Sequence, residues 1–326
     1  MQSMQKITMR GVRTAATILA AAGAIAAAPP TSARADATAR PEIAYVRNGD
    51  IYVSSGRAEK RLTTGGGHAR PRWSLDGRRI AYLAAGQLWT MNADGGGQRR
   101  LTTRAAAGPS WSPDGKWIAF ASLSCTGGPG VYRIATTATA TPEVLFPRDC
   151  RGEELPPAPV VTPRVGTLTE RLRTDDAVAW SPDGGRIAFR GGECESTYDA
   201  CLSVGTVATG GEQTVAAFGG GSLQTRGFAV VPSWRPDGAR LAWTAFQQGE
   251  TAAENEPVHL VEYDPATRAT HTVGGALDRE LNYLDANHAV VTSQYGGGSW
   301  VTFVGLVDGT RQLFHPGSQA SVRPAR

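Results

Sequence analysis

Two acidic stretches hold the side chains best suited to bind a charged ligand. Neither contains Lys or Arg, and together they contribute six carboxylates: Glu193, Glu195, Asp199, Glu250, Glu254 and Glu256. Ca²⁺ is bound by several carboxylate oxygens, and the same charges would attract a cationic partner. Acidic residues in loops are usually solvated. Two interpretations therefore stand, a solvated surface or a patch for Ca²⁺ or a cationic partner, and no other cofactor is indicated.

Four cysteines point to disulfide chemistry. An even cysteine count in an exported chain is typical of disulfides, and of the three possible pairings we favour Cys125–Cys150 with Cys194–Cys201. The second pair would close a short loop, which stabilises by about 2–3 kcal/mol in the chain-entropy account. A zinc site is the weaker alternative, because the sequence has no Cys-x-x-Cys pair and no His near these cysteines.

Local motifs for enzymatic chemistry are missing from the sequence. It has no Gly-x-Ser-x-Gly, no His-Glu-x-x-His and no phosphate-binding loop. Five histidines are scattered without the spacing of metal ligands. An active site assembled from distant segments leaves no such signature. A hydrolase or lyase acting on polysaccharide therefore stays open as an alternative, and a carboxylate pair in a central channel would favour it.

A ten-residue repeat supplies the elements that must position these side chains. Its four copies span residues 73–82, 111–120, 180–189 and 234–243, and each reads Trp, two variable residues, Asp-Gly, and then Ile or Leu, Ala and an aromatic. Asp bonds its own backbone and Gly takes the left-handed position of a turn, so each copy predicts a tight hairpin. The tryptophans of the repeat are predicted to pack between sheets. The repeated carboxylates are predicted to stabilise these turns, and they are Asp76, Asp114, Asp183 and Asp237.

Two further strands follow each copy, which makes four antiparallel strands per unit. Such a unit is one blade of a β-propeller, so the predicted fold is all-β with six blades. The predicted blades cover about 42–64, 70–103, 108–146, 176–215, 231–273 and 282–314. The first lacks its innermost strand, and residues 319–323 are predicted to supply it, which closes the ring and protects a sheet edge.

The repeated Trp-Ser-Pro-Asp-Gly turn followed by Ile-Ala-aromatic resembles the TolB-type repeat, also called WD40-like or PD40. With weaker copies the resemblance covers roughly residues 42 to 314. It implies a propeller that serves as a binding platform rather than a catalyst. TolB itself carries an α/β domain before its propeller, for which this chain has no room. The partners known for that family are therefore not carried over.

The N-terminal segment 1–35 is typical of a secretory signal. Basic residues precede an Ala-rich apolar run, and Ala33-Arg34-Ala35 resembles a cleavage site. The apolar run is too short and Ala-rich for a good membrane anchor. The segment carries four of the 33 basic residues and none of the 29 acidic ones. The remainder is formally neutral, which gives no support for a nucleic-acid footprint. We expect an extracytoplasmic or secreted location at the cell envelope.

Long segments interrupt the repeat only in blades 3 to 5. They are residues 122–129, 146–176, 191–200, 216–229 and 246–257. All are connections between strands 2 and 3 or between blades, so they are predicted to lie on one face, together with the four cysteines. Function in repeat folds tends to sit where such loops cluster. The sequence predicts a monomeric, non-catalytic platform that binds a protein or glycan there; an envelope scaffold without a ligand is the third interpretation.

Overall fold

The computed structural model describes residues 40–137, 140–153, 166–219 and 226–324, and Arg40–Arg326 form one compact unit. The predicted signal, residues 1–35, lies outside the described residues. Within the described part of the chain, no helix is long and apolar enough to cross a membrane.

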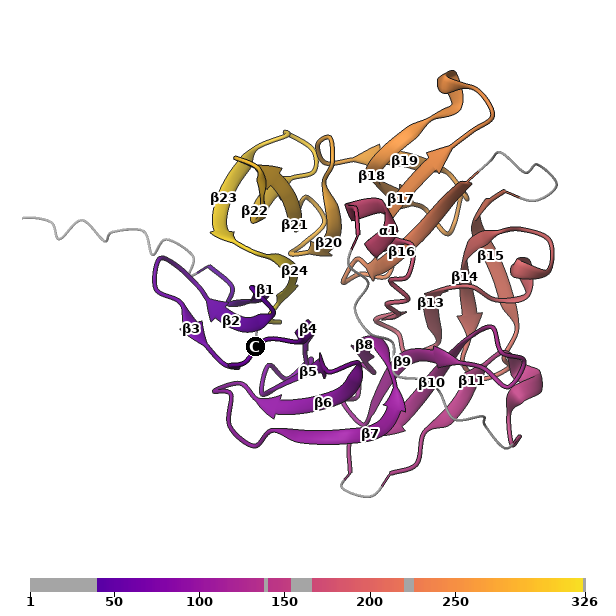
Figure 1. The fold of residues 1–326 in the computed structure, drawn as a ribbon, viewed down its shortest axis with the longest axis horizontal. Helices are drawn as coiled ribbons and strands as arrows, with labels where there is room; N and C mark the ends of the chain where they lie inside the picture. The colour runs from indigo at the N-terminus through magenta and orange to yellow at the C-terminus, as the bar shows by residue number, and fades with distance from the viewer. Residues whose placement is uncertain (1–39, 138–139, 154–165, 220–225, 325–326) are drawn as a thin grey trace, which may run out of the picture. The chain divides into compact units, whose positions relative to one another are not determined.

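Six four-stranded antiparallel sheets follow one another around an axis, which confirms the predicted all-β propeller (Figure 1). From the axis outward, blades 1 to 6 are: β24 (Ser318–Val322), β1 (Ile43–Arg47), β2 (Asp50–Ser54), β3 (Lys60–Arg61); β4 (His68–Trp73), β5 (Arg79–Ala84), β6 (Gln87–Asn92), β7 (Arg99–Ala105); β8 (Ala107–Trp111), β9 (Trp117–Leu123), β10 (Pro129–Ala135), β11 (Glu143–Phe146); β12 (Ala179–Trp180), β13 (Arg186–Arg190), β14 (Ala200–Thr206), β15 (Glu212–Phe218); β16 (Arg226–Trp234), β17 (Leu241–Gln248), β18 (Glu256–Tyr263), β19 (Thr270–Val273); β20 (Arg279–Tyr283), β21 (His288–Tyr295), β22 (Gly298–Gly305), β23 (Arg311–Pro316).

The C-terminal strand β24 completes blade 1 and closes the ring, as predicted. It pairs antiparallel with β1, with Ile43 opposite Val322 and Ala44 opposite Ser321. Beyond it, Arg323 forms an ion pair with Glu42 at 2.5 Å. The first blade is therefore built from both ends of the described chain, and neither end leaves the inner edge of β1 unpaired.

The repeated aspartates lie in their own turns. The Asp76 carboxylate accepts from Ser74 Oγ at 2.6 Å and from the Arg78 amide at 3.0 Å, and Asp114 and Asp183 make the corresponding contacts. In the fourth copy Asp237 accepts from Arg235 Nε and from the Ala239 amide. The glycine that follows each Asp has a positive φ between 63° and 76°, a region that other residues avoid. In blade 6, Asp285 does the same work by accepting from the Asn287 and His288 amides.

The repeat tryptophans lie between neighbouring blades. Trp111 donates to the Arg72 carbonyl of blade 2 at 3.0 Å, and Trp234 donates to the Ala179 carbonyl of blade 4 at 3.2 Å. In three blades an arginine of the preceding blade covers the indole ring at 4.7 Å: Arg79 over Trp111, Arg186 over Trp234 and Arg323 over Trp73. Hydrogen bonds and cation–π contacts of Trp73, Trp111 and Trp234 thus join adjacent sheets, whereas Trp180 donates to the Gly184 carbonyl of its own turn at 2.9 Å.

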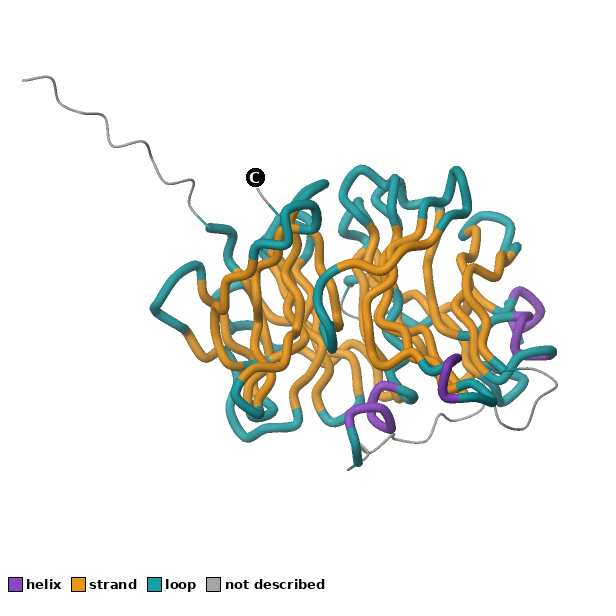
Figure 2. The backbone as a smooth tube through the Cα atoms, turned by 90° about the horizontal axis from the view of Figure 1, so that it is seen from above, coloured by secondary structure: helices purple, strands orange, loops and turns teal. Residues whose placement is uncertain are grey.

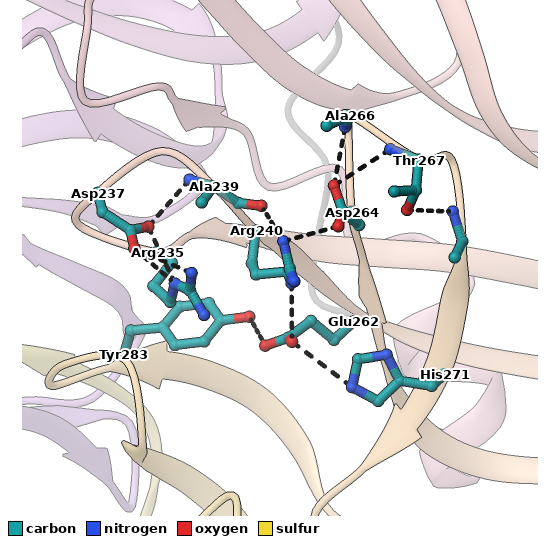
Figure 3. A network of polar contacts seen from close by, with 11 residues as sticks. Arg235, Asp237, Ala239, Arg240, Glu262, Asp264, Ala266, Thr267, His271 and Tyr283 are labelled. Atoms are coloured by element: carbon teal, nitrogen blue, oxygen red, sulfur yellow. Dashed lines mark hydrogen bonds and ion pairs between the residues drawn. The ribbon is translucent and has the colours of Figure 1, made fainter.

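Blade 6 has a tyrosine in place of the tryptophan, and a polar network replaces the stacked arginine (Figure 3). Tyr283 donates to the Glu262 carboxylate of blade 5 at 2.6 Å. Arg240 and His271 each lie 3.5 Å from the other oxygen of Glu262. Burial and the hydrogen bond to Glu262 raise the pKa of Tyr283, so the hydroxyl stays a donor. Blades 5 and 6 are therefore joined by hydrogen bonds and ion pairs, where three other pairs of blades are joined by an arginine stacked on a tryptophan.

The long connections all leave the same end of the sheets. In an antiparallel four-stranded blade, turns 1–2 and 3–4 lie at one end, while connections 2–3 and the blade crossings lie at the other. The four short helices of the described residues all lie in connections of the second class: η1 (Arg148–Cys150), α1 (Leu168–Leu172), η2 (Glu193–Ser196) and η3 (Ala252–Glu254). Figure 2 shows these helical turns away from the opposite row of hairpin turns. We call this end the long-loop face.

Candidate functional site

A cavity of about 770 Å³ opens at the axis on the long-loop face. Its walls are the first residues of the inner strands, the 2–3 connections of blades 2 and 3, and the segment that contains α1. Four arginines and four acidic residues line it: Arg70, Arg171, Arg190, Arg279, Asp175, Asp176, Asp199 and Glu280.

Irregularities in the inner strands aim several of these side chains at the axis. The pairing register shifts in β4, β16, β20 and β24. In each of these strands one residue has a positive φ of 51° to 58°, and it lies three positions before Trp73, Trp234, Tyr283 or Val322. These residues are Arg70, Val231, Glu280 and Gln319. β-Bulges of this kind re-aim side chains and are frequent at functional sites. Three of these four residues line the cavity: Arg70, Glu280 and Gln319.

The equivalent position in blade 3 is Gly108, and the reason is space. A Cβ on Gly108 would lie 2.3 Å from the Cβ of Ala177, which occupies the same position in blade 4. The Val178 amide donates to the Gly108 carbonyl at 3.0 Å. A glycine is therefore required for blades 3 and 4 to meet at the axis.

Arg70, Glu280 and Gln319 form one buried network. Arg70 Nη1 lies 2.9 Å from Glu280 Oε1, and both side chains are about 95% buried. The Arg70 amide donates to Gln319 Oε1 at 2.8 Å, and the Gln319 amide donates to Glu280 Oε2 at 2.9 Å. Thr292 Oγ1 donates to the same oxygen at 2.6 Å. Blades 1, 2 and 6 are thus connected through one carboxylate.

The surrounding charges decide the ionisation of this carboxylate. Burial by itself raises the pKa of Glu280, but the charges of Arg70 and Arg279 and the hydrogen bonds from Thr292 and Gln319 outweigh burial and hold that pKa at about 2. Deeper in β4, burial lowers the pKa of Arg72 to about 10, and the charge of Arg70 acts in the same direction. Glu280 is consequently ionised, and the arginines around it stay charged at neutral pH.

The segment containing α1 brings further charge to the cavity. Thr167 caps α1 and Glu170 completes a capping box, while Leu172 packs in a cluster with Phe228 and Val230 of β16. The chain that follows places Asp175 in an ion pair with Arg70. Asp176 pairs with Arg190 at 2.7 Å. Burial raises the pKa of Asp176, against the effect of Arg190.

Among the five predicted ligand-face carboxylates whose side chains the structure describes, Asp199 is the one that lines this cavity. Glu254 accepts from the Glu250 and Thr251 amides and so orders its own loop. Glu256 lies 3.5 Å from His259. Glu193 begins η2, whereas the Glu195 side chain lies outside the described part of the structure.

No metal site joins these carboxylates in the described residues, which contain no group of three His, Cys, Asp or Glu side chains able to hold a metal ion. The cavity arginines and Glu280 did not emerge from the sequence analysis. For Arg70 and Glu280 the available signal was their shared position, three residues before Trp73 and Tyr283 respectively, where the residue type changes from blade to blade.

The structure pairs Cys125 with Cys150 and Cys194 with Cys201, the pairing that the sequence favoured. The first bond ties the 2–3 connection of blade 3 to η1, and the second crosses the 2–3 connection of blade 4. Both therefore lie on the long-loop face. Disulfides persist in oxidising compartments, which indicates an extracytoplasmic protein.

We expect the two disulfides to stabilise unequally. They span 25 and 7 residues, and the chain-entropy account gives about 3.5 and about 2.5 kcal/mol respectively. The double variants Cys125→Ser/Cys150→Ser and Cys194→Ser/Cys201→Ser should lose stability in that order in urea unfolding. The opposite order would mean that native contacts, rather than loop closure, set the difference.

Comparisons with known proteins agree with the fold. No family model matches the chain. The uncharacterised peptidase YuxL of Bacillus subtilis (strain 168) is 30% identical over 150 residues, which is 40% of this chain and 22% of that protein. The chain thus spans about a fifth of that relative's length.

Two solved structures resemble most of the chain. TolB from Acinetobacter baumannii aligns with a TM-score of 0.63 and 16% identity, over 87% of this chain and 67% of its own. A putative TolB from Agrobacterium tumefaciens aligns with a TM-score of 0.58 and 15% identity, over 87% and 93%. Such identities establish the fold alone. By its architecture and its repeated turns, the chain is a TolB-like six-bladed β-propeller.

Proposed function

We propose that this chain is an exported, non-catalytic binding platform at the cell envelope, and that it holds a protein or glycan ligand at the axial cavity of the long-loop face. The observation that carries this proposal is the cavity itself, about 770 Å³ in volume and bordered by the elaborated connections. Pockets of this size with a few convergent polar groups are the usual binding sites of proteins.

A polysaccharide hydrolase or lyase is the second candidate, because carboxylates do meet in the channel. Asp176 favours it, since its pKa is raised by burial, as a general acid requires. Against it, Asp175 and Glu280 are both bound to Arg70, and Asp176 is bound to Arg190. Carboxylates neutralised by arginine are poor nucleophiles and bases. The platform is therefore the better supported of the two.

The proposal is tested by blocking the cavity. Thr174 is exposed and lines it, so Thr174→Trp should fill part of the opening. Val307, 81% exposed in the 3–4 turn of blade 6, gives the matched control Val307→Trp at the opposite end of the sheets. Envelope extract and a glycan array are applied to wild-type protein and both variants.

We expect a ligand retained by the wild type and by Val307→Trp, and at least about tenfold weaker binding to Thr174→Trp, equivalent to about 1.4 kcal/mol. Equal retention by Thr174→Trp would place binding elsewhere. Release of sugar from a polysaccharide by the wild type, lost in Asp176→Asn, would favour the enzyme instead.

A further inference from the structure

We propose that Arg171 and Arg279 form an oxyanion-binding subsite in the axial cavity, which takes a carboxylate or phosphate group of the ligand. This inference rests on the proposed function and adds the chemistry of the group that the cavity recognises. The observation behind it is that most acidic residues of the cavity form ion pairs, whereas Arg171 and Arg279 form none with the described residues.

Arg279 is a buried cation whose hydrogen-bond partners are neutral. The residue is 3% exposed. Its Nη2 donates to Ser299 Oγ at 2.8 Å, and the Gln294 amide oxygen, in the orientation that satisfies both ends of that amide, accepts from Nη1 at 3.0 Å. Within the described chain, Arg279 has no ion-pair partner. The charge of Glu280 acts on this guanidinium, but the direct ion pair of Glu280 is with Arg70. Burying a charge without a direct counter-charge is costly, and an anion from a ligand would supply that contact.

Arg171 points its charge at the same space from α1. It is exposed, lines the cavity, and forms no ion pair with any other described residue. Burial lowers the pKa of Arg279, Glu280 opposes that effect, and the charge of Arg171 adds to it. Both residues line the same cavity, so an anion bound there would interact with both cations.

Three of the four acidic residues of the cavity are paired with arginines other than Arg171 and Arg279. Glu280 and Asp175 are both paired with Arg70. Asp176 is paired with Arg190. Asp199 comes from the 2–3 connection of blade 4, whereas Arg279 begins blade 6. The lining is formally neutral as a whole, yet none of its described carboxylates forms a direct ion pair with Arg171 or Arg279.

The ligand chemistry follows from the guanidinium. Its planar fork of donors matches carboxylate and phosphate oxygens and binds them through two parallel hydrogen bonds. The described residues that line the cavity include no Trp, Tyr or Phe, so stacking on an aromatic ring contributes little there. Charge and hydrogen bonding are left to select the ligand, and both favour an oxyanion.

The experiment titrates the purified protein with two probes, succinate and inorganic phosphate, by calorimetry at low salt. Arg171→Gln and Arg279→Gln remove one cation each. Arg173→Gln is the matched control, because Arg173 is exposed, directly follows α1 and is not among the residues of the cavity wall. Succinamide, which carries no charge, controls for the carbon skeleton.

We expect saturable binding of at least one oxyanion, weakened by about fivefold to tenfold in Arg171→Gln and more in Arg279→Gln, and unchanged in Arg173→Gln. Preference for one probe identifies the group as carboxylate or phosphate. Binding that weakens equally in Arg173→Gln, or no binding of either probe, overturns the subsite. Because Arg171 is exposed, its variant keeps the test valid if Arg279→Gln does not fold.

Failure of the subsite and failure of the proposed function are distinguishable. If neither probe binds while Thr174→Trp still abolishes retention of the envelope ligand, the platform stands and the oxyanion assignment falls. If the probes bind as expected but no ligand depends on the cavity, the subsite stands and the platform falls.

Discussion

Removal of residues 317–326 should lower the melting temperature by at least about 10 °C, because it deletes strand β24 and opens the ring. Ala320 and Ser321 are at most 4% exposed, and β24 covers the inner edge of β1. For a domain of this size each kcal/mol shifts the melting temperature by roughly 2–4 °C. We expect loss of a whole inner strand to lower the free energy of unfolding by several kcal/mol.

The contacts of β24 explain why the effect should reach beyond blade 1. Gln319 joins Arg70 of blade 2 to Glu280 of blade 6. Ser321 Oγ accepts from the Trp73 amide at 3.1 Å, and Arg323 covers the Trp73 ring. Deletion therefore removes an inner strand together with its contacts to blades 2 and 6. We expect thermal unfolding to become less cooperative and its midpoint to fall.

Differential scanning calorimetry checks this expectation, with a chain ending at Pro324 as the control. That shorter deletion removes only residues 325 and 326 and should leave the midpoint unchanged. If the long deletion yields no folded protein, Ala320→Asp places a carboxylate at a position with no exposed surface and should give a smaller fall in the same direction. An unchanged midpoint in both variants would contradict closure by β24.

The blade architecture could be predicted from the sequence because its determinants are local. Asp114 and Gly115 interact within their own turn, and so do their counterparts in the other copies. Blade 6 lacks the Asp-Gly pair, yet Asp285 accepts from the Asn287 and His288 amides of its own turn, so its turn is also locally determined. A turn whose hydrogen bonds are made within the turn keeps the same residue types in each copy, so the sequence shows it.

The candidate site could not be predicted in the same way because its partners are far apart in the chain. Arg70 and Glu280 are separated by more than 200 positions and meet only when blades 2 and 6 close around the axis. Local reasoning instead favoured acidic loops, of which Asp199 lines the cavity while Glu254 orders its own backbone. Arg70 and Glu280 share one position of the repeat, three residues before Trp73 and Tyr283, and the residue type at that position differs between blades.

Neutralising the buried carboxylate with Glu280→Gln should destabilise the protein by about 3–5 kcal/mol at pH 7, as does removal of one partner from a buried ion pair. The amide keeps the shape of the side chain but removes the charge that faces Arg70 and Arg279. Glu143→Gln is the matched control, because that carboxylate pairs with Arg133 at 2.8 Å while 51% exposed. An exposed pair contributes at most about 1 kcal/mol.

The pH dependence gives this prediction a second, independent readout. The pKa of Glu280 is lowered from 4.5 to about 2 in the folded protein. A lowered folded-state pKa stabilises above the unfolded value, and the contribution, about 3 kcal/mol, is lost as the pH falls from about 4.5 towards 2. The difference in urea-unfolding free energy between wild type and Glu280→Gln should therefore shrink across that range. A difference that stays constant with pH would mean that the carboxylate acts by shape and hydrogen bonding, and that its charge does not hold the axial arginines.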